Sequence, residues 1–330
     1  MSQIFPTAYS TFCTTALAGL VSENYGLSEA GCKMLLRGVG DTYLIQAAEG
    51  RFILRVYRSS HRNYAQIKAE TELLMALKEA RVAVSYPITD LAGNQIQRIQ
   101  AAEGERHAVL FTYAPGKAYT VLNDKQLGEL GRQMARFHDV SSAIDLGNSR
   151  WCFNLETTLF KPLAGLKPFF AEDPETYEWL CGAASRVQHK LSTLNTAAFS
   201  AGYCHFDFMP KNFHFDGDKV TLFDFDFFGH GWLINDVMTF RQHLCLEVHY
   251  GKAVQEEADK AYSTFLEGYR EYRSLSEDEL AAVPYLGLGF WLFYLHFYTT
   301  HDQFYPLLQP LQLKARTALI RQLMERYWKD

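Results

Sequence analysis

The sequence predicts an α+β protein with two lobes: a small, antiparallel, β-rich lobe over residues 1–112 and a larger, mainly α-helical lobe over residues 113–330. Short β-rich runs separated by turn residues gather in the first third of the chain. Long segments with apolar residues at helical spacing dominate the remainder. The chain has 330 residues, of which 48% are hydrophobic, and this is enough apolar material for two cores.

The N-terminal lobe begins with a predicted helix at 10–25, which ends near Gly26. Two apolar runs flank Ala48-Glu49-Gly50 and predict a hairpin, and an earlier run that leads into Gly38-Val39-Gly40 predicts a third strand. A helix with apolar residues at helical spacing follows. The predicted strands lie at 34–36, 42–47, 52–57, 82–90, 94–99 and 107–114, and the helix lies at 63–80. Ala114-Pro115-Gly116-Lys117 reads as a turn or linker.

The C-terminal lobe is predicted to be helical around a short island of strands and loops at 202–229. Apolar spacing indicates helices at 124–142, 155–200 (two or more), 251–272, 280–300 and 310–329. The most apolar run, 284–298, is short for a bilayer span and contains Pro, Gly and His. We therefore expect it to be a buried, aromatic core helix.

Composition narrows the class of protein. The net charge is −5 and the basic residues form no tract, so a nucleic-acid surface is not expected. The six cysteines are scattered without a CxxC pair, which disfavours a disulfide framework or a structural zinc site. The first residues lack a basic stretch, so no signal peptide is expected. We expect a cytoplasmic protein without a membrane partner, and the oligomeric state stays open.

Two motifs carry the chemistry: HFDFMPKN at 205–212 and LFDFDFF at 222–228. Acids are poor residues for strand interiors, and a carboxylate in apolar surroundings needs compensation. The spacing suits phosphoryl transfer, which needs in-line positioning and charge neutralisation. Asp207 would orient the acceptor hydroxyl and take its proton, while Asn212 and Asp224 would hold Mg2+ through hard oxygen atoms. A hairpin turn at Asp216-Gly217-Asp218 would bring these two ligands to the same end.

These residues resemble known kinase motifs. HFDFMPKN is similar to the catalytic loop H-R-D-L-x-x-x-N, and Asp224-Phe225-Asp226 stands where kinases have D-F-G. The match is closer to the aminoglycoside phosphotransferase and type II homoserine-kinase-like family, which writes HxDxxPxN followed by IDFD or a variant. Asp236 in GHGWLINDV matches that family's acidic residue after the motif. The resemblance runs from about residue 24 to about residue 300 and implies a protein-kinase-like fold, ATP and Mg2+ as cofactors, and a small-molecule acceptor.

The resemblance also assigns expected roles in the N-terminal lobe. Arg55 occupies the place of the basic strand residue that faces the nucleotide phosphates, and Glu70 that of its pairing acid. Gly38 and Gly40 form the glycine loop. FTYAPG looks like the hinge that borders adenine, so backbone groups of Phe111, Thr112 and Tyr113 are expected to bind it. The segment LGRQMARFHDVS, with His138, carries the family's L-A-x-L-H signature.

The sequence departs from the family in two places. Arg55 stands where lysine is commoner, and arginine is always charged but differs in geometry. The loop Gly38-Val39-Gly40 is short, and Asp41 follows where the family often has asparagine. Fewer backbone N–H groups can therefore cover the phosphates.

Several roles stay open. Asp207, Asn212 and Asp224 could each, taken alone, cap a turn. Asp226 could be a metal ligand, a support for one, or a strand-end cap. Glu72 could replace Glu70, because helix phase from sequence is uncertain by a residue or two. Two further residues are expected to act structurally rather than as bases, namely His205 as a loop anchor and Asp236.

The leading hypothesis is a metabolite kinase of the homoserine-kinase-like group. The segment at about 145–200, which builds the acceptor site in this family, is rich in aromatic residues and has few acids before 172–178, whereas aminoglycosides are polycations that favour acid-lined clefts. An aminoglycoside phosphotransferase and an atypical protein kinase resembling stress response kinase A stay open; no A-P-E segment follows the DFD motif. The alternatives outside kinases are a nucleotide-binding pseudokinase and a metal-dependent phosphohydrolase using His205, Asp207, His214, Asp224 and Asp226.

Overall fold

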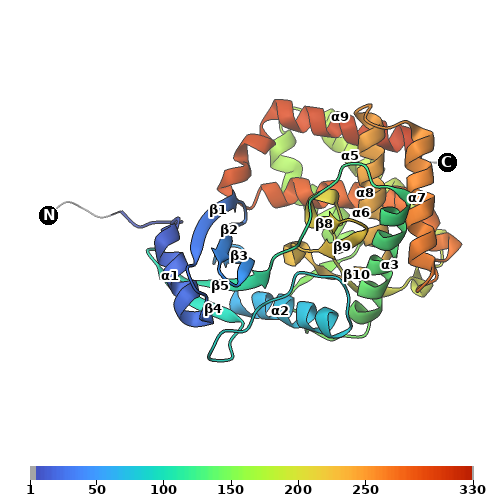
Figure 1. The fold of residues 1–330 in the computed structure, drawn as a ribbon. Helices are drawn as coiled ribbons and strands as arrows, with labels where there is room; N and C mark the ends of the chain where they lie inside the picture. Colours follow the sequence, from blue (N-terminus) through green and yellow to red (C-terminus); the bar gives the residue numbers. More distant parts are fainter. Residues whose placement is uncertain (1–4, 329–330) are drawn as a thin grey trace. The chain divides into compact units, whose positions relative to one another are not determined.

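The structure is a computed structural model that describes residues 5–328. Its contacts divide the chain into two compact units, and Figure 1 labels most of their helices and strands. Unit 1 comprises the chain up to Gly116 together with Leu146–Ser149 and Thr221–Phe223. Unit 2 comprises Lys117–Asp145, Arg150–Val220 and the chain from Asp224 onward. The combination of an antiparallel sheet and a helical part confirms the predicted α+β class, and the lobe boundary at residue 112 stays a prediction.

Unit 1 contains one sheet of five antiparallel strands in the order β1-β2-β3-β5-β4. The predicted hairpin is confirmed: Ala47 pairs with Gly50 across the turn, and Thr42 pairs with Arg55. Gly50 has φ 134°, a region that a residue with a side chain rarely adopts. The elements are α1 (Thr14–Tyr25), β1 (Gly31–Arg37), β2 (Gly40–Ala47), β3 (Gly50–Tyr57), α2 (Tyr64–Glu79), β4 (Ile96–Ala101) and β5 (Gly104–Thr112).

The core of unit 1 lies between α1 and the sheet. Leu17 and Val21 of α1 pack in one cluster with alternate residues of the central strands, such as Tyr43 and Ile45 on β2. This period-two alternation places the apolar side chains on the face that α1 covers. Helix α2 begins where Asn63 caps it: the Asn63 side chain accepts from the Gln66 N–H, and the Gln66 side chain accepts from the Asn63 N–H.

The prediction of a strand at 82–90 is wrong. Val84 and Pro87 form only isolated bridges, to Leu222 and Phe111 respectively. Pro87 lacks the backbone N–H that a ladder requires, so it interrupts pairing in the middle of the segment. The segment crosses from α2 to β4 as extended chain instead.

Unit 2 is mainly helical, with two small sheets. The helices are α3 (Asp124–Ser141), α4 (Lys161–Leu166), α5 (Pro174–Ser192), α6 (Ile234–His249), α7 (Gln255–Arg270), α8 (Glu277–Tyr298) and α9 (Pro310–Tyr327). The strands are β6 (Trp151–Phe153), β7 (Ala201–Cys204), β8 (Phe213–Asp216), β9 (Lys219–Leu222), whose last two residues are counted with unit 1, and β10 (Gly229–Trp232). β10 pairs with β6 and β7, and the hairpin β8–β9 turns at Gly217, as predicted. The sequence had predicted neither β6 nor α6.

Two glycines allow α3 and α7 to cross at close range. A Cβ atom on Gly131 would lie 2.1 Å from the backbone oxygen of Phe265, and one on Gly268 would lie 2.1 Å from that of Gly128. No side chain can be added there unless a helix backbone moves. This crossing holds α3, which carries His138, against the helices that follow the motifs.

Helix α8 is the segment that was expected to be a core helix. It is the one described helix that is long and apolar enough to cross a membrane by length and composition, yet 67% of its apolar window is buried inside the fold. Ser276 caps its start, with Glu279 completing a capping box. The burial confirms a core helix.

Candidate active site

The loop after β7 holds the first motif. β7 ends at Cys204, the chain turns sharply at Phe206 (φ 60°), and a short 3-10 turn over Pro210–Asn212 leads into β8. The turn buries the functional side chains: Asp207 and Asn212 are each 4% exposed. A positive φ is uncommon for a bulky residue, so the surrounding contacts must hold Phe206 in place.

Asp207 is held from two sides. The Asn212 Nδ2 donates to the Asp207 backbone oxygen at 2.8 Å and to its Oδ2 at 2.9 Å. The Lys211 Nζ lies 2.6 Å from the same Oδ2. The amide nitrogen of Asn212 faces Asp207, so in this hydrogen-bond assignment its Oδ1 points away from Asp207. This oxygen is therefore available as a hard ligand for a metal ion.

The electrostatics of Asp207 and Lys211 are linked. Burial raises the pKa of the Asp207 carboxyl, the nearby Lys211 charge opposes this, and the Asp224 charge adds a smaller increase. Partial desolvation acts to lower the pKa of Lys211, but the Asp207 carboxylate raises it above its ordinary value. Lys211 therefore stays protonated, and its side chain remains 63% exposed.

The second motif places its two acids differently. Asp224 is exposed and has φ 60° and ψ 61°, whereas Asp226 is buried in the 3-10 turn Phe225–Phe227. Arg150 donates to the backbone oxygens of Phe225, Asp226 and Phe228, and its guanidinium lies 4.0 Å from the Phe228 ring centroid. Arg150 thus fixes the path of the segment. A metal-ligand role for Asp226 stays a prediction.

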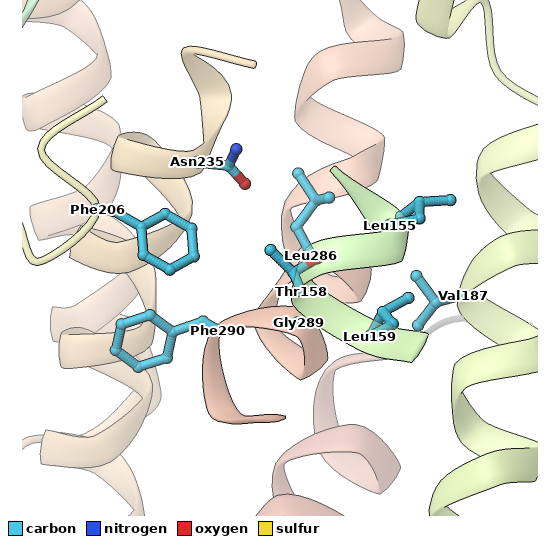
Figure 2. A pocket seen from close by; sticks show the side chains of 9 residues that line it. All are labelled: Leu155, Thr158, Leu159, Val187, Phe206, Asn235, Leu286, Gly289 and Phe290. Carbon is cyan, nitrogen blue, oxygen red and sulfur yellow. The ribbon is translucent and has the colours of Figure 1, made fainter. Parts of the chain in front are cut away.

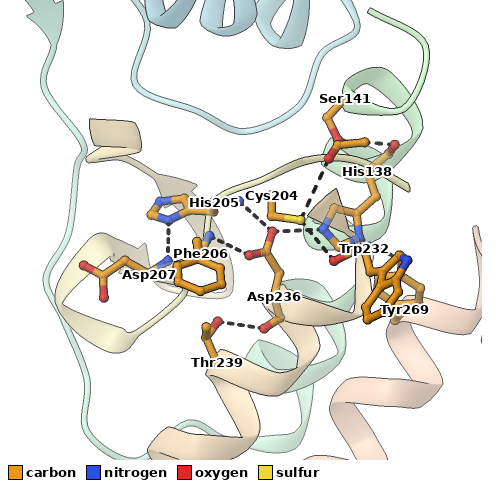
Figure 3. A network of polar contacts seen from close by, with 11 residues as sticks. His138, Ser141, Cys204, His205, Phe206, Asp207, Trp232, Asp236, Thr239 and Tyr269 are labelled. Atoms are coloured by element: carbon orange, nitrogen blue, oxygen red, sulfur yellow. Dashed lines mark hydrogen bonds and ion pairs between the residues drawn. The ribbon is translucent and has the colours of Figure 1, made fainter. Parts of the chain in front are cut away.

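Asp236 is the centre of a buried polar network (Figure 3). Its carboxylate accepts from the backbone N–H groups of His205, at 2.8 Å, and Phe206, at 2.7 Å. Its Oδ2 also lies 3.0 Å from the His138 Nε2, and the His138 Nδ1 lies 2.8 Å from the Tyr269 hydroxyl. One carboxylate at the start of α6 therefore satisfies the two N–H groups at the sharp turn of the loop.

The network selects one protonation state and one tautomer of the His138 ring. Burial lowers the pKa of His138 despite the neighbouring Asp236, so the ring is neutral at neutral pH. Burial also raises the pKa of Tyr269, which keeps its hydroxyl as a donor. We therefore assign Nε2–H as the donor to Asp236 and Nδ1 as the acceptor from Tyr269. His205 differs: its Nδ1 accepts from the Asp207 N–H at 3.3 Å, as a loop anchor would.

In unit 1, Arg55 lies on β3 between Thr42 of β2 and Val109 of β5. Of the two candidate acids on α2, Glu70 is 1% exposed, whereas Glu72 is 47% exposed and lies 3.4 Å from Lys68. An ionisable side chain is rarely fully buried unless it is paired, so the burial favours Glu70 as the acid with a structural partner. The pairing of Glu70 with Arg55 stays a prediction.

The glycine loop and the hinge are also in unit 1. The Gly38 N–H donates to the Gly40 oxygen at 2.9 Å, which closes a tight turn between β1 and β2. A Cβ on Gly40 would lie 3.1 Å from the Val56 oxygen. At the hinge, the Thr112 N–H donates to the Tyr86 oxygen. The Thr112 N–H is therefore already committed. Phe111 is buried at the end of β5, and the Tyr113 ring lies under Arg51 at 4.1 Å.

The predicted metal ligands fit a site with few protein ligands. Within residues 5–328, no three His, Cys, Asp or Glu side chains gather as a metal site. The Asn212 Oδ1 and the exposed Asp224 carboxylate are hard oxygen atoms that flank the β8–β9 hairpin, one just before β8 and one just after β9, at the end opposite its turn. Mg2+ is commonly held by one or two carboxylates plus substrate phosphates and water, so this donor set fits the ion when nucleotide supplies the remaining oxygens.

A cavity of about 200 Å³ opens beside Asp207. Its walls come from the catalytic loop, from α8 and from α9. A second cavity, drawn in Figure 2, has Phe206 and Phe290 on one side and Leu159 and Val187 on the other. It measures about 10 Å³, which is room for no more than about one water molecule. Of these two cavities, the one beside Asp207 is large enough to admit an acceptor, and Asp207 is part of its lining.

Sequence reasoning missed two residues that contact the site. Lys211 was present in the motif, and its position four residues after Asp207 in a tight turn was the available signal. Arg150 lies 75 to 78 residues before the carbonyls it binds, so no local pattern indicated it.

The known proteins that this chain resembles include phosphotransferases. A model of the phosphotransferase enzyme family matches residues 35–277. An uncharacterized protein of Deinococcus radiodurans is 35% identical over 283 residues, which span 85% of this chain and 80% of that protein. Amicoumacin kinase of Bacillus subtilis is 24% identical over 80% of this chain and 78% of its own. Homoserine kinase of Paramagnetospirillum magneticum is 26% identical over 78% of this chain and 77% of its own.

Solved structures share the fold. Amicoumacin kinase hAmiN, solved with AMP-PNP and Ca2+, has a TM-score of 0.76 at 18% identity, covering 96% of this chain and 94% of that one. A microcompartment-associated aminopropanol kinase has a TM-score of 0.69 at 20% identity, covering 95% and 97%. These likenesses confirm the predicted protein-kinase-like fold.

Proposed function

Because this chain belongs to the phosphotransferase enzyme family and is a small-molecule kinase, we propose that it uses ATP and Mg2+ to phosphorylate a hydroxyl group of a homoserine-like metabolite. The observation that carries the proposal is the buried carboxylate of Asp207, held by Asn212 and Lys211 at the edge of a cavity. A general base must lie within reach of the acceptor proton, and the cavity gives an acceptor access to Asp207.

The roles of the chain's residues follow from their contacts. Asp207 orients the acceptor hydroxyl and accepts its proton. Asn212 fixes the carboxylate through its Nδ2 and offers Oδ1 to the metal together with Asp224. When bound, Mg2+ neutralises the phosphate charge that builds up during transfer. Asp236 and His205 hold the loop in the conformation that presents Asp207.

Unit 1 is proposed to bind the nucleotide. Arg55, with Glu70 as its partner, would contact the phosphates, and Gly38 and Gly40 would allow the backbone to approach them. Among the predicted hinge residues, the Thr112 N–H already donates to Tyr86. The Thr112 carbonyl accepts from the Ser85 hydroxyl at 2.6 Å, so the backbone carbonyls of Phe111 and Tyr113 are the remaining candidates for the adenine amino group.

The test is Mg·ATP turnover, measured as ADP release, across homoserine, choline, ethanolamine, methylthioribose, hydroxylysine, aminoglycosides and a generic protein substrate. Asp207→Asn is the control, since asparagine keeps the shape but cannot accept the proton. Acceptor-dependent ADP release that is lost in the variant supports the proposal. Absence of nucleotide binding would sink it, and binding without any turnover would indicate a pseudokinase.

An antibiotic kinase is the second candidate. The similarity to amicoumacin kinase of Bacillus subtilis and the TM-score of the hAmiN structure favour it as much as the homoserine kinase relatives favour a metabolite. The aminoglycoside members of the panel, with amicoumacin added, separate the two. A kcat/KM for an antibiotic well above that for every metabolite would establish the second candidate.

A further inference from the structure

The cavity beside Asp207 has a positive lining. Lys211 of the catalytic loop and Arg316 of α9 both line it. Of the described residues that line it, Asp207 alone is acidic, so two cations face one carboxylate and one positive charge is left over. A site that binds a polycation would instead be lined by more acidic than basic side chains.

Arg316 is the unbalanced cation. Its guanidinium carbon lies 5.3 Å from the centroid of the Tyr298 ring. Its Nε is buried and has no hydrogen-bond partner in the described part of the chain, and no carboxylate there forms an ion pair with it. A buried donor on a charged group is costly to leave unsatisfied, so a ligand with an anionic group would stabilise this arrangement.

The wall between Asp207 and Arg316 comes largely from α8. Trp291, Tyr294 and Tyr298 present aromatic surface to the cavity, and the Trp291 N–H donates to Gln242 at 3.0 Å. The Tyr294 hydroxyl is buried close to the Asp207 carboxylate, and its position forms no hydrogen bond of normal geometry with a described residue. Burial, with a smaller effect of the Asp207 charge, raises the pKa of Tyr294, so the phenol keeps its proton as a donor for a ligand.

We propose that the acceptor is a small hydroxy acid whose hydroxyl lies at Asp207 and Tyr294 and whose carboxylate is bound by Arg316. This inference rests on the proposed kinase function and specifies the chemical class of its acceptor. Arginine suits a carboxylate because its planar fork matches the two oxygens. At about 200 Å³ the cavity is smaller than the roughly 300–1,000 Å³ of sites for drug-sized ligands, which suits a compact acid.

The experiment compares matched ligands. Homoserine, 4-hydroxybutyrate and 3-amino-1-propanol share one hydroxyl and differ in the carboxylate and the amine, and 4-(hydroxymethyl)benzoate adds an aromatic body. Calorimetry measures binding of each to the full chain with and without AMP-PNP, and ADP release measures turnover. We expect the carboxylates to bind at least about tenfold more tightly than 3-amino-1-propanol, as loss of a charge-assisted hydrogen bond implies.

Variants assign the effect to one side chain. Arg316→Gln should remove the preference for the carboxylates and raise their KM at least about tenfold, while the KM for ATP stays unchanged. Arg316→Lys should restore part of the preference for the carboxylates. Lys314→Gln removes the same charge from an exposed position on α9 and should change nothing. A rise in the KM for ATP instead would assign Arg316 to the nucleotide phosphates and overturn the inference.

Failure of the inference and failure of the proposed function are distinguishable. Arg316-dependent binding of the carboxylates without turnover would support the hydroxy-acid site and reject the kinase. ATP-dependent turnover of an acceptor without a carboxylate, with none of the acids binding, would support the kinase and overturn the hydroxy-acid site.

Discussion

The Asp236 carboxylate accepts a hydrogen bond of 2.7 Å from the backbone N–H of Phe206, the residue with φ 60° at the sharp turn of the catalytic loop. Phe206 immediately precedes Asp207, so this bond determines where the proposed base points. The same carboxylate accepts from His205 and lies against the His138 Nε2. A side chain on α6 thereby positions a loop about 30 residues earlier in the chain.

Asp236→Asn should uncouple the loop from α6. The Asp236 carboxylate receives three donors, namely the backbone N–H groups of His205 and Phe206 and the His138 Nε2–H. An asparagine side chain replaces one of the two acceptor oxygens with an NH2 group, so at least one of these donors loses its acceptor. We expect roughly 2–4 kcal/mol of lost stability by urea unfolding. We also expect a fall in kcat of about tenfold or more with nucleotide affinity nearly unchanged, because a small misplacement of Asp207 is costly.

Thr239→Val is the matched control for Asp236→Asn. It removes the hydroxyl that donates to the Asp236 backbone oxygen and leaves the carboxylate intact. A normal kcat in Asp236→Asn, or an equal loss in Thr239→Val, would contradict the positioning role.

Lys211→Met tests the cation beside Asp207. The change leaves a buried carboxylate without its 2.6 Å partner, so kcat/KM should fall about tenfold or more. Stability should also fall, by about 1–3 kcal/mol, because the Asp207 carboxylate stays buried and loses a charged partner. Steady-state kinetics and urea unfolding measure the two effects. Lys260→Met, which breaks an exposed pair with Asp124, should change neither quantity, and full activity of Lys211→Met would exclude a role for the lysine.

His138 should make the fold sensitive to acid. Its pKa is lowered in the folded state by burial, so below about pH 6.5 the unfolded chain takes up the proton first and stability falls with falling pH. The groups that face the ring are Asp236, Tyr269, Asp139 and Arg273. His138→Gln keeps a donor toward Asp236 but does not titrate. The stability of this variant should therefore fall less steeply with falling pH than that of the wild type, with a difference in slope of up to about 1.4 kcal/mol per pH unit.

Urea unfolding between pH 5 and pH 8 tests the prediction for His138. Other histidines with a lowered pKa, such as His243, contribute equally to the wild type and the variant, so the difference between the two slopes isolates His138. Parallel curves would show that the proton on His138 is not linked to folding.

Gly131→Ala should destabilise unit 2 severely. The added Cβ would lie 2.1 Å from the Phe265 backbone oxygen and 2.7 Å from the Tyr269 nitrogen, so α3 and α7 must separate. Overpacking costs typically about 1–3 kcal/mol, and a backbone neighbour that cannot rotate away puts this site at the upper end or beyond. Gly182→Ala on α5, where the new Cβ meets nothing within 4 Å, should instead stabilise by up to about 1 kcal/mol. Thermal unfolding of the pair measures both, and equal melting temperatures would refute the close crossing.

Local signals in the sequence predicted the elements well where they are regular. The hairpin at 42–57, the turn at Gly217 and the long helices follow from period-two and helical spacing and from turn residues, which act over a few neighbours. The motif residues Asp207 and Asn212 were predicted for the same reason, because their spacing lies within one short loop. The segment 82–90 was mispredicted because β-rich composition outweighed Pro87.

The sequence by itself determined the fold class, the family resemblance and the identity of the proposed base, because each is written in contiguous residues. Only the tertiary structure decided which of Glu70 and Glu72 is buried, that Asp236 binds the loop backbone, that Arg150 holds the carbonyls around Asp226, and that Arg316 lines the cavity beside Asp207. These relationships join residues far apart in the chain. Packing of whole helices and strands brings such residues together, and no local periodicity encodes that packing.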